Sequence, residues 1–169
     1  AIAFLEQRVF STTQLSNERR DALTDRFEAI APEDGRHYAI RFRASKIGPN
    51  ALALPGGVIY VTDELVELAP DDDAVLGVLA HELGHIERRH LMRRLFASAA
   101  VGAAAAVLFG DVSTLLAALP AILIDLDYSR AMEREADSYA VELLRANGIP
   151  TGSLATLFER MQKVHDKRG

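Results

Sequence analysis

Two histidines and a glutamate stand close together in the segment His81-Glu82-Leu83-Gly84-His85. Residues four apart lie on one face of a helix, so the imidazoles of His81 and His85 could bind one zinc ion together. Glu82 lies about 100° around the helix from His81, within reach of a zinc-bound water without being a ligand itself. Zinc lowers the pKa of such a water to about 7. The spacing predicts a metalloprotease site in which Glu82 is the general base that takes the proton of this water.

A catalytic zinc site needs a third protein ligand and an open position for water. The segment Glu-Arg-Glu-Ala-Asp at 133–137 offers three carboxylates in one predicted helix. Glu133 and Asp137 are four apart and share a face of that helix, whereas Glu135 points elsewhere. Metal-bound imidazoles are usually oriented by an acceptor on the other ring nitrogen. We therefore predict that Glu133 is the third ligand and that Asp137 orients one of the two histidines.

The predicted zinc-binding segment lies on a long helix that starts after Pro70 with three aspartates at 71–73. Its apolar residues recur at helical spacing: Val75, Leu76, Val78, Leu79, Leu83, Ile86, Leu91 and Leu95. His90 lies five residues beyond His85, so we expect it to face away from the metal, on the surface. Gly84 costs about 1 kcal/mol of helix propensity relative to alanine, which indicates that another segment, such as the Glu133 helix, packs closely there.

The remaining pattern predicts an α+β domain that is mainly helical, with a small β-sheet against the zinc-binding helix. Helices are expected at 16–30, after the capping residue Thr62, at 127–148 and after 151. Strands are expected at 37–44 and on either side of the Pro55-Gly56-Gly57 break. The strand at 50–54 has two interpretations, a hairpin strand of the core sheet or a sheet edge beside the metal. At such an edge an extended peptide substrate could add as one more strand.

Two apolar runs, 97–110 and 112–124, predict a helical hairpin that bends near residues 109–111. Each run is shorter than the roughly 20 residues that a helix needs to span a bilayer. A buried or domain-capping hairpin is the favoured interpretation. The alternative is contact with a membrane surface, which the arginines at 88, 89, 93 and 94 favour.

Composition limits the class of protein. A chain of 169 residues that is 49% hydrophobic predicts one globular domain over 1–169. The formal net charge of −5 argues against a nucleic-acid partner. Without cysteine, a metal must be held by histidine and carboxylate. The chain starts at Ala1 with neither an initiator methionine nor a signal-peptide pattern, so we expect a mature or trimmed fragment.

Three motifs together resemble the zinc metallopeptidases of the CAAX prenyl protease, HtpX and BepA type, which are gluzincins. The motifs are His-Glu-Leu-Gly-His at 81–85, Tyr-Ser-Arg at 128–130 and Glu-Arg-Glu-Ala-Asp at 133–137, and the segment 50–57 is similar to that family's strand and turn. The resemblance implies a zincin-like fold and a single Zn²⁺. The residues to which it assigns roles are His81, His85 and Glu133 as zinc ligands, Glu82 as catalytic base, Asp137 as support of the site, and Ala51, Leu52 and Ala53 beside the substrate.

The chain also departs from that family's pattern. It lacks the His-Pro segment followed by an arginine that members often carry, so the resemblance does not identify the group that stabilises the oxyanion. Tyr128, Arg130 and His165 are all candidates. Full membrane spans of the prenyl proteases are missing as well, so no prenylated substrate is implied. The BepA-like and mitochondrial quality-control branches look more similar.

The sequence therefore predicts a zinc-dependent endopeptidase that cleaves proteins or peptides, associated with a membrane or the cell envelope, in protein quality control. One rival is a zinc-stabilised binding or chaperone-like module with an inactive site, against which the intact Glu82 argues. A second rival is a metal-free, helical partner-binding domain, which predicts no stoichiometric zinc.

Overall fold

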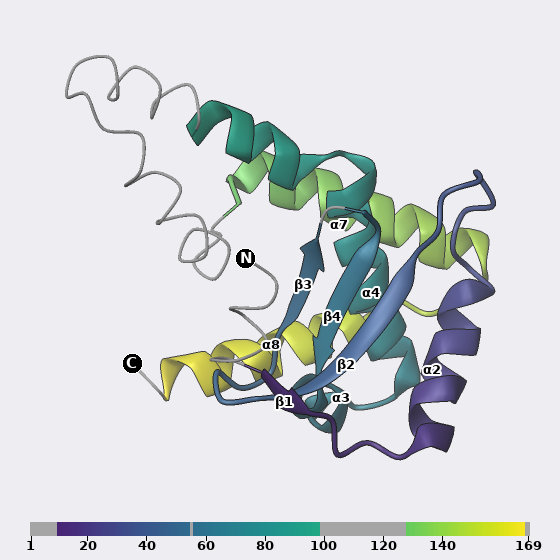
Figure 1. The fold of residues 1–169 in the computed structure, drawn as a ribbon, viewed down its shortest axis with the longest axis vertical. Helices are drawn as coiled ribbons and strands as arrows, with labels where there is room; N and C mark the ends of the chain where they lie inside the picture. Colours follow the sequence, from purple (N-terminus) through teal and green to yellow (C-terminus); the bar gives the residue numbers. More distant parts are fainter. Residues whose placement is uncertain (1–9, 55, 99–127, 168–169) are drawn as a thin grey trace.

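The computed structural model describes residues 10–54, 56–98 and 128–167 (Figure 1). Its elements in chain order are β1 (Phe10–Thr12), α2 (Asn17–Glu28), β2 (Ala39–Ser45), β3 (Ala51–Leu54), β4 (Val58–Thr62), α3 (Asp63–Leu68), α4 (Asp72–Glu87), α7 (Arg130–Ala146) and α8 (Gly152–Asp166). Residues 90–98 form a further helix after α4. The predicted fold class, mainly helical α+β with a small sheet, is confirmed. The predicted hairpin at 97–124 lies outside the described residues except for its first two.

The four strands form one mixed sheet in the order β1-β2-β4-β3. The central pair β2 and β4 is parallel, while β1 and β3 pair antiparallel with their neighbours. β3 is therefore an edge strand, as in the second predicted interpretation, and it also pairs antiparallel with the next strand β4, as in the first. β1 was not predicted, because three residues are too few to show an alternating pattern.

Helix α4 is the centre of the fold. It packs against β3 and β4 of the sheet and against the helices α2, α3, α7 and α8. In Figure 1, α4 runs behind the sheet, with α7 (green) crossing near the top of the view and α8 (yellow) near the bottom. Every residue from Ala74 to His85 is buried except Glu82. A helix with neighbours on all sides must be apolar almost all round, as the sequence of α4 is.

Side-chain caps begin α2, α3 and α4 where the sequence predicts these helices to start, whereas α7, predicted from residue 127, begins at Arg130. Ser16, Thr62, Asp71 and Ser129 each accept a hydrogen bond from a backbone N–H in the first turn of α2, α3, α4 and α7 respectively. Asp71 also accepts a hydrogen bond of 2.6 Å from the hydroxyl of Ser153, which ties the start of α4 to α8.

The end of α4 differs from the prediction. The helix ends at Glu87, Arg89 takes a left-handed backbone conformation (φ 53°), and helical structure resumes at His90. The apolar spacing that continues to Leu91 and Leu95 is thus carried by two helices with a break between them. None of the helices in the described ranges combines the length and the apolar character that crossing a bilayer requires.

Candidate metal centre

The three predicted metal ligands converge on one point between α4 and α7. The Nε2 atoms of His81 and His85 are 3.0 Å apart. The carboxylate of Glu133 lies 3.3 Å from Nε2 of His81 through Oε2 and 3.6 Å from Nε2 of His85 through Oε1. One potential ligand atom from each residue lies within 4.8 Å of the others. Two imidazoles and one carboxylate at this separation are a donor set that suits zinc, with one position left open.

Close packing of α7 on α4 makes this convergence geometrically possible. A Cβ added to Gly84 would lie 3.0 Å from Cα and 3.1 Å from the carbonyl oxygen of Ala136 in α7. The predicted tight contact of the Glu133 helix at Gly84 is therefore confirmed. Gly77 plays a similar part on another face of α4, where an added Cβ would lie 2.9 Å from Cβ of Leu154 in α8.

Asp137 lies beside the first of the two histidines. Its Oδ1 is 2.9 Å from Nδ1 of His81, one helical turn from Glu133 on the same face of α7. When Nδ1–H of His81 donates to Asp137, the lone pair of Nε2 is left free for a metal. The sequence predicted that Asp137 orients one of the two histidines without saying which, and the structure places it beside His81.

The prediction that His90 is a surface residue facing away from the metal is wrong. Its exposed fraction is 0%, and its Nδ1 lies 2.9 Å from Nδ1 of His85. Its Nε2 lies 3.1 Å from Oε2 of Glu135, the carboxylate that was expected to point away from the metal pair. The error comes from the break at Arg89, because the angle between His85 and His90 was counted along an unbroken helix. Nothing in the apolar spacing reveals this break.

Glu82 is the only partly exposed residue in the middle of α4, and it points toward the sheet edge. Its Oε2 accepts a hydrogen bond of 2.9 Å from the backbone N–H of Ala53 in β3. Burial raises the pKa of the Glu82 carboxyl, against the lowering effect of His81 and of this hydrogen bond. A carboxylate with a raised pKa holds a proton better, which suits a general base working near neutral pH.

Burial and the neighbouring charges shift the pKa values of the three proposed ligands in different directions. Burial, helped by the neighbouring His81, lowers the pKa of His85 to about 4, so this ring is neutral at pH 7. Burial disfavours the charged form of His81 too, but the nearby carboxylates, Glu133 first among them, outweigh it and raise the pKa of His81. The hydrogen bond with His81 lowers the pKa of Glu133, which keeps that carboxylate ionised.

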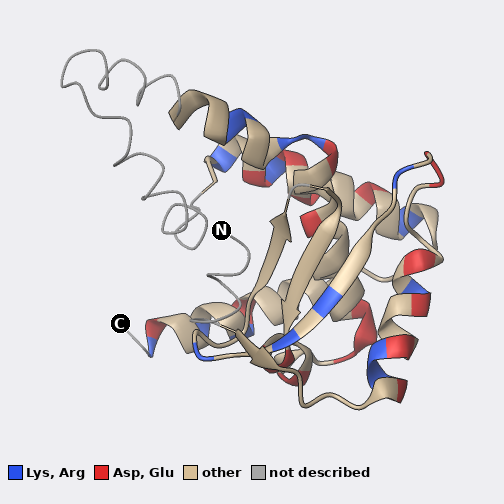
Figure 2. Ribbon diagram, in the orientation of Figure 1, with Lys and Arg blue, Asp and Glu red and all other residues tan. Residues whose placement is uncertain are grey.

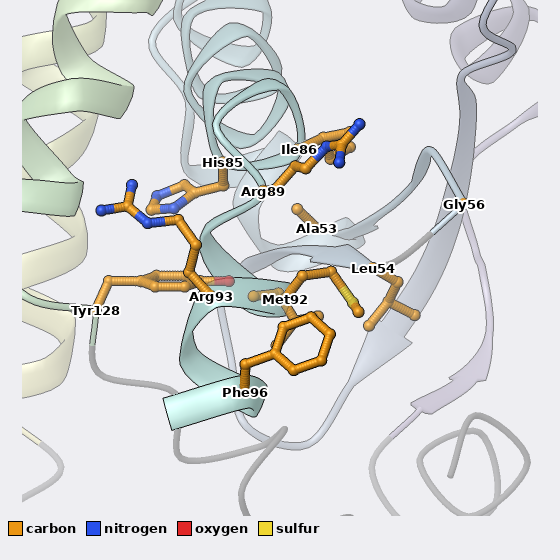
Figure 3. A pocket seen from close by; sticks show the side chains of 11 residues that line it. Ala53, Leu54, Gly56, His85, Ile86, Arg89, Met92, Arg93, Phe96 and Tyr128 are labelled. Atoms are coloured by element: carbon orange, nitrogen blue, oxygen red, sulfur yellow. The ribbon is translucent and has the colours of Figure 1, made fainter. Parts of the chain in front are cut away.

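Two pockets lie on either side of the metal centre. The first, of about 350 Å³, has His85 and Tyr128 in its wall and apolar side chains such as Leu54, Met92 and Phe96 around them (Figure 3). The second, of about 550 Å³, is lined by His81 and Glu133, by residues of the loop between β2 and β3 such as Asn50, and by residues of α8 such as His165.

The three candidate oxyanion donors lie in different places. Tyr128 stacks on the ring of His85 with centroids 4.1 Å apart, and its buried hydroxyl has no hydrogen-bond partner in the described structure. His165 lines the second pocket. Arg130 is the exposed first residue of α7. Burial and the charges of Glu82 and Glu133 raise the pKa of Tyr128, so its hydroxyl keeps a proton to donate.

Comparison with known proteins agrees with this geometry. The model of "Peptidase family M48" matches residues 17–166. Metalloprotease LoiP of Escherichia coli is 36% identical over 126 residues, which cover 70% of this chain and 50% of LoiP. Mitochondrial metalloendopeptidase OMA1 of Schizosaccharomyces pombe is 32% identical over 127 residues, 72% of this chain and 37% of OMA1. The Escherichia coli beta-barrel assembly-enhancing protease is 26% identical over 125 residues, 66% of this chain and 26% of that protein.

This chain thus spans half or less of the length of these relatives. The family match covers most of the chain, from the start of α2 to the end of α8. It includes both helices that carry the metal centre. The resemblance inferred from the motifs is confirmed, and the chain belongs to Peptidase family M48.

Proposed function

We propose that this chain is the catalytic part of a zinc-dependent metalloendopeptidase. The observation that carries the proposal is the convergence of His81, His85 and Glu133, with Glu82 between them and the edge strand β3. Membership of a peptidase family supports it. A purely structural zinc site would have no use for a carboxylate such as Glu82 next to its ligands.

Each residue of the centre would have a separate role in peptide hydrolysis. A zinc ion bound here would supply a Lewis acid that polarises the scissile carbonyl and allows water to be activated near neutral pH. Glu82 takes the proton of the attacking water at its carboxylate and passes it to the leaving amine nitrogen. Asp137 holds the His81 ring with its Nε2 turned toward the metal position.

The proposed substrate lies along the free edge of β3. Asn50 pairs with Thr62 through a backbone hydrogen bond of 3.0 Å, and antiparallel pairing alternates, so the backbone groups of Ala51 and Ala53 point away from β4. The N–H of Ala53 reaches Glu82, and the N–H of Ala51 reaches the side-chain oxygen of its neighbour Asn50. An extended peptide that replaced these contacts would add to the sheet and pass Glu82.

The two pockets support this path, because β3 runs from one to the other. Asn50, just before the strand, lines the pocket at His81, whereas Ala53 and Leu54 line the apolar pocket at His85. A peptide on β3 would therefore cross the metal centre between the two pockets and place an apolar side chain in the first. Ala51, Leu52 and Ala53 remain the predicted substrate-binding residues.

The membrane or envelope location also stays a proposal. Two relatives carry names that refer to mitochondria and to beta-barrel assembly. In this chain the helix 90–98 exposes Met92 and Phe96, with exposed fractions of 38% and 69%, and arginines gather where α4 gives way to that helix (Figure 2). Apolar side chains beside basic ones are typical of contact with an anionic membrane surface.

The test of the proposed activity is Glu82→Gln, with cleavage of fluorescently labelled casein and the zinc content measured together. We expect one zinc per chain in both proteins, because Glu82 is not a ligand. Cleavage by the variant should fall by about 10²–10⁴-fold, the usual contribution of a general base. Removing zinc with a chelator should abolish cleavage by the wild type, and adding zinc should restore it.

The matched control is Glu142→Gln, which makes the same chemical change at an exposed position of α7. It should cleave casein and bind zinc like the wild type. If the wild type binds zinc but cleaves nothing between pH 6 and 9, the proposal fails in favour of a zinc-stabilised binding module. If it binds no zinc, a metal-free binding domain is the better description.

A further inference from the structure

His90 has a place in the molecule that the metal centre described above does not explain. Its ring is completely buried, and both ring nitrogens have polar neighbours, Nδ1 facing His85 and Nε2 facing Glu135. Arg93, one helical turn further along, donates to the same oxygen of Glu135 at 3.2 Å. A continuous polar chain therefore runs from the surface pair Arg93–Glu135 through His90 to His85.

Hydrogen bonding fixes the tautomer of each ring in this chain. For His85 to offer the Nε2 lone pair to a metal, its proton must sit on Nδ1, where it donates to Nδ1 of His90. The proton of His90 must then sit on Nε2, where it donates to the carboxylate of Glu135. Arg93 in turn holds Glu135 in place. The ring N–H of each histidine then has an acceptor, and the free lone pair of His85 points to the metal position.

We propose that His90, Glu135 and Arg93 are positioning residues that orient His85 for zinc binding. In this respect they match Asp137, which takes the same part for His81. The inference rests on the proposed zinc centre. It adds a hydrogen-bond acceptor for His85, the ring of His90, which in turn donates to the carboxylate of Glu135. His81, by contrast, contacts the carboxylate of Asp137 directly.

The turn at Arg89 supports this role. A residue other than glycine rarely adopts a positive φ, and doing so costs free energy that surrounding structure must offset. Here the turn brings His90 against His85, an arrangement that an unbroken helix could not make. Tyr128, which stacks on His85 and lies with ring centroids 6.0 Å from His90, closes the other side of the pair.

The most informative variant is Glu135→Gln, because this side chain is 41% exposed and the amide that replaces the carboxylate has the same size and shape. We expect its zinc affinity to fall by about tenfold, the lower end of the effect of losing an outer partner of a metal ligand. The visible spectrum of the cobalt-substituted protein should also change, since the ring of His85 is held differently. A purely structural role would leave that spectrum unaltered. Without metal, the variant should melt at the temperature of the wild type.

The control for the loss of one negative charge on α7 is Glu142→Gln, which should keep wild-type zinc affinity and cobalt spectrum. A double-mutant cycle with His90→Leu distinguishes an effect of Glu135 that acts through His90 from a long-range effect of its charge on zinc binding. If Glu135 acts through His90, adding Glu135→Gln to His90→Leu should weaken zinc binding no further. His90→Gln, whose amide can both accept and donate, should recover part of the affinity that His90→Leu loses.

The proposal is overturned if Glu135→Gln binds zinc as tightly as Glu142→Gln, or if its effect is the same with and without His90. It is also overturned if the wild type binds two zinc ions per chain and His90→Leu binds one, because His90 would then be a ligand. If the wild type binds zinc and cleaves casein, but the Glu135 and His90 variants bind zinc like the control Glu142→Gln, the positioning role alone is refuted. Wild-type protein that binds no zinc would refute both this role and the proposed function.

Discussion

At the scale of single residues, Gly84 controls the distance between the two halves of the metal centre. It precedes His85 in α4 and faces the backbone of Ala136 in α7, three residues beyond Glu133. The two atoms nearest an added Cβ are backbone atoms of Ala136, which cannot move aside as the end of a flexible side chain would. A side chain here must therefore push α7 away and carry Glu133 with it.

Gly84→Ala should destabilise the fold and weaken zinc binding. Overpacking costs about 1–3 kcal/mol, and the better helix propensity of alanine returns about 1 kcal/mol. We expect a net loss of up to about 2 kcal/mol in denaturant unfolding without metal, together with a lower zinc affinity in titration. Gly152→Ala is the control, because its added Cβ would meet nothing within 4 Å. Equal stability and zinc affinity in both variants would refute the close approach.

Spacing within one helix made most of the centre predictable. The pairs His81–His85 and Glu133–Asp137 are each four residues apart, and helical geometry alone places each pair on one face. The sequence could not show that Asp137 would meet His81 instead of His85, because that depends on how α7 packs on α4. His90 could not be found either, since its direction depends on one left-handed residue, Arg89, that no sequence pattern marks.

At the scale of elements, helix starts were the most predictable feature. Ser16, Thr62 and Asp71 carry short polar side chains just before apolar periodic segments, and each caps its helix as expected. The break between α4 and the helix 90–98 was missed because the apolar spacing continues across it. The edge position of β3 was one of two interpretations, since strand order is a property of the whole sheet.

The helix 90–98 is the described element best suited to a membrane surface. With Phe96 and Met92 exposed beside basic residues, we expect the protein to float with vesicles that contain anionic lipid, and less with neutral vesicles. Phe96→Ser should weaken this binding because it removes the most exposed large apolar side chain of the described structure.

Ile47→Ser is the control for that measurement, since Ile47 is also exposed (44%) but lies between β2 and β3. It should float with the vesicles like the wild type. If the wild type does not bind anionic vesicles, or if both variants lose binding equally, this helix is not a membrane contact.

At the scale of the whole molecule, the proposed zinc ion joins two helices that are far apart in the sequence. In this proposal α4 supplies two imidazoles and the general base, and α7 supplies the third ligand and the acceptor for His81. The sheet packs against α4 and presents β3 to Glu82, so the fold brings metal ligands, base and substrate edge together. Binding, orientation and chemistry all depend on the position of α7 against α4.

The anomalous difference density of zinc-loaded crystals, collected at the zinc absorption edge, tests this most directly. One peak per chain should lie about 2.0–2.2 Å from Nε2 of His81, Nε2 of His85 and a carboxylate oxygen of Glu133. A peak that is held by the two histidines while Glu133 lies beyond bonding distance, or a peak at another position, would contradict the account.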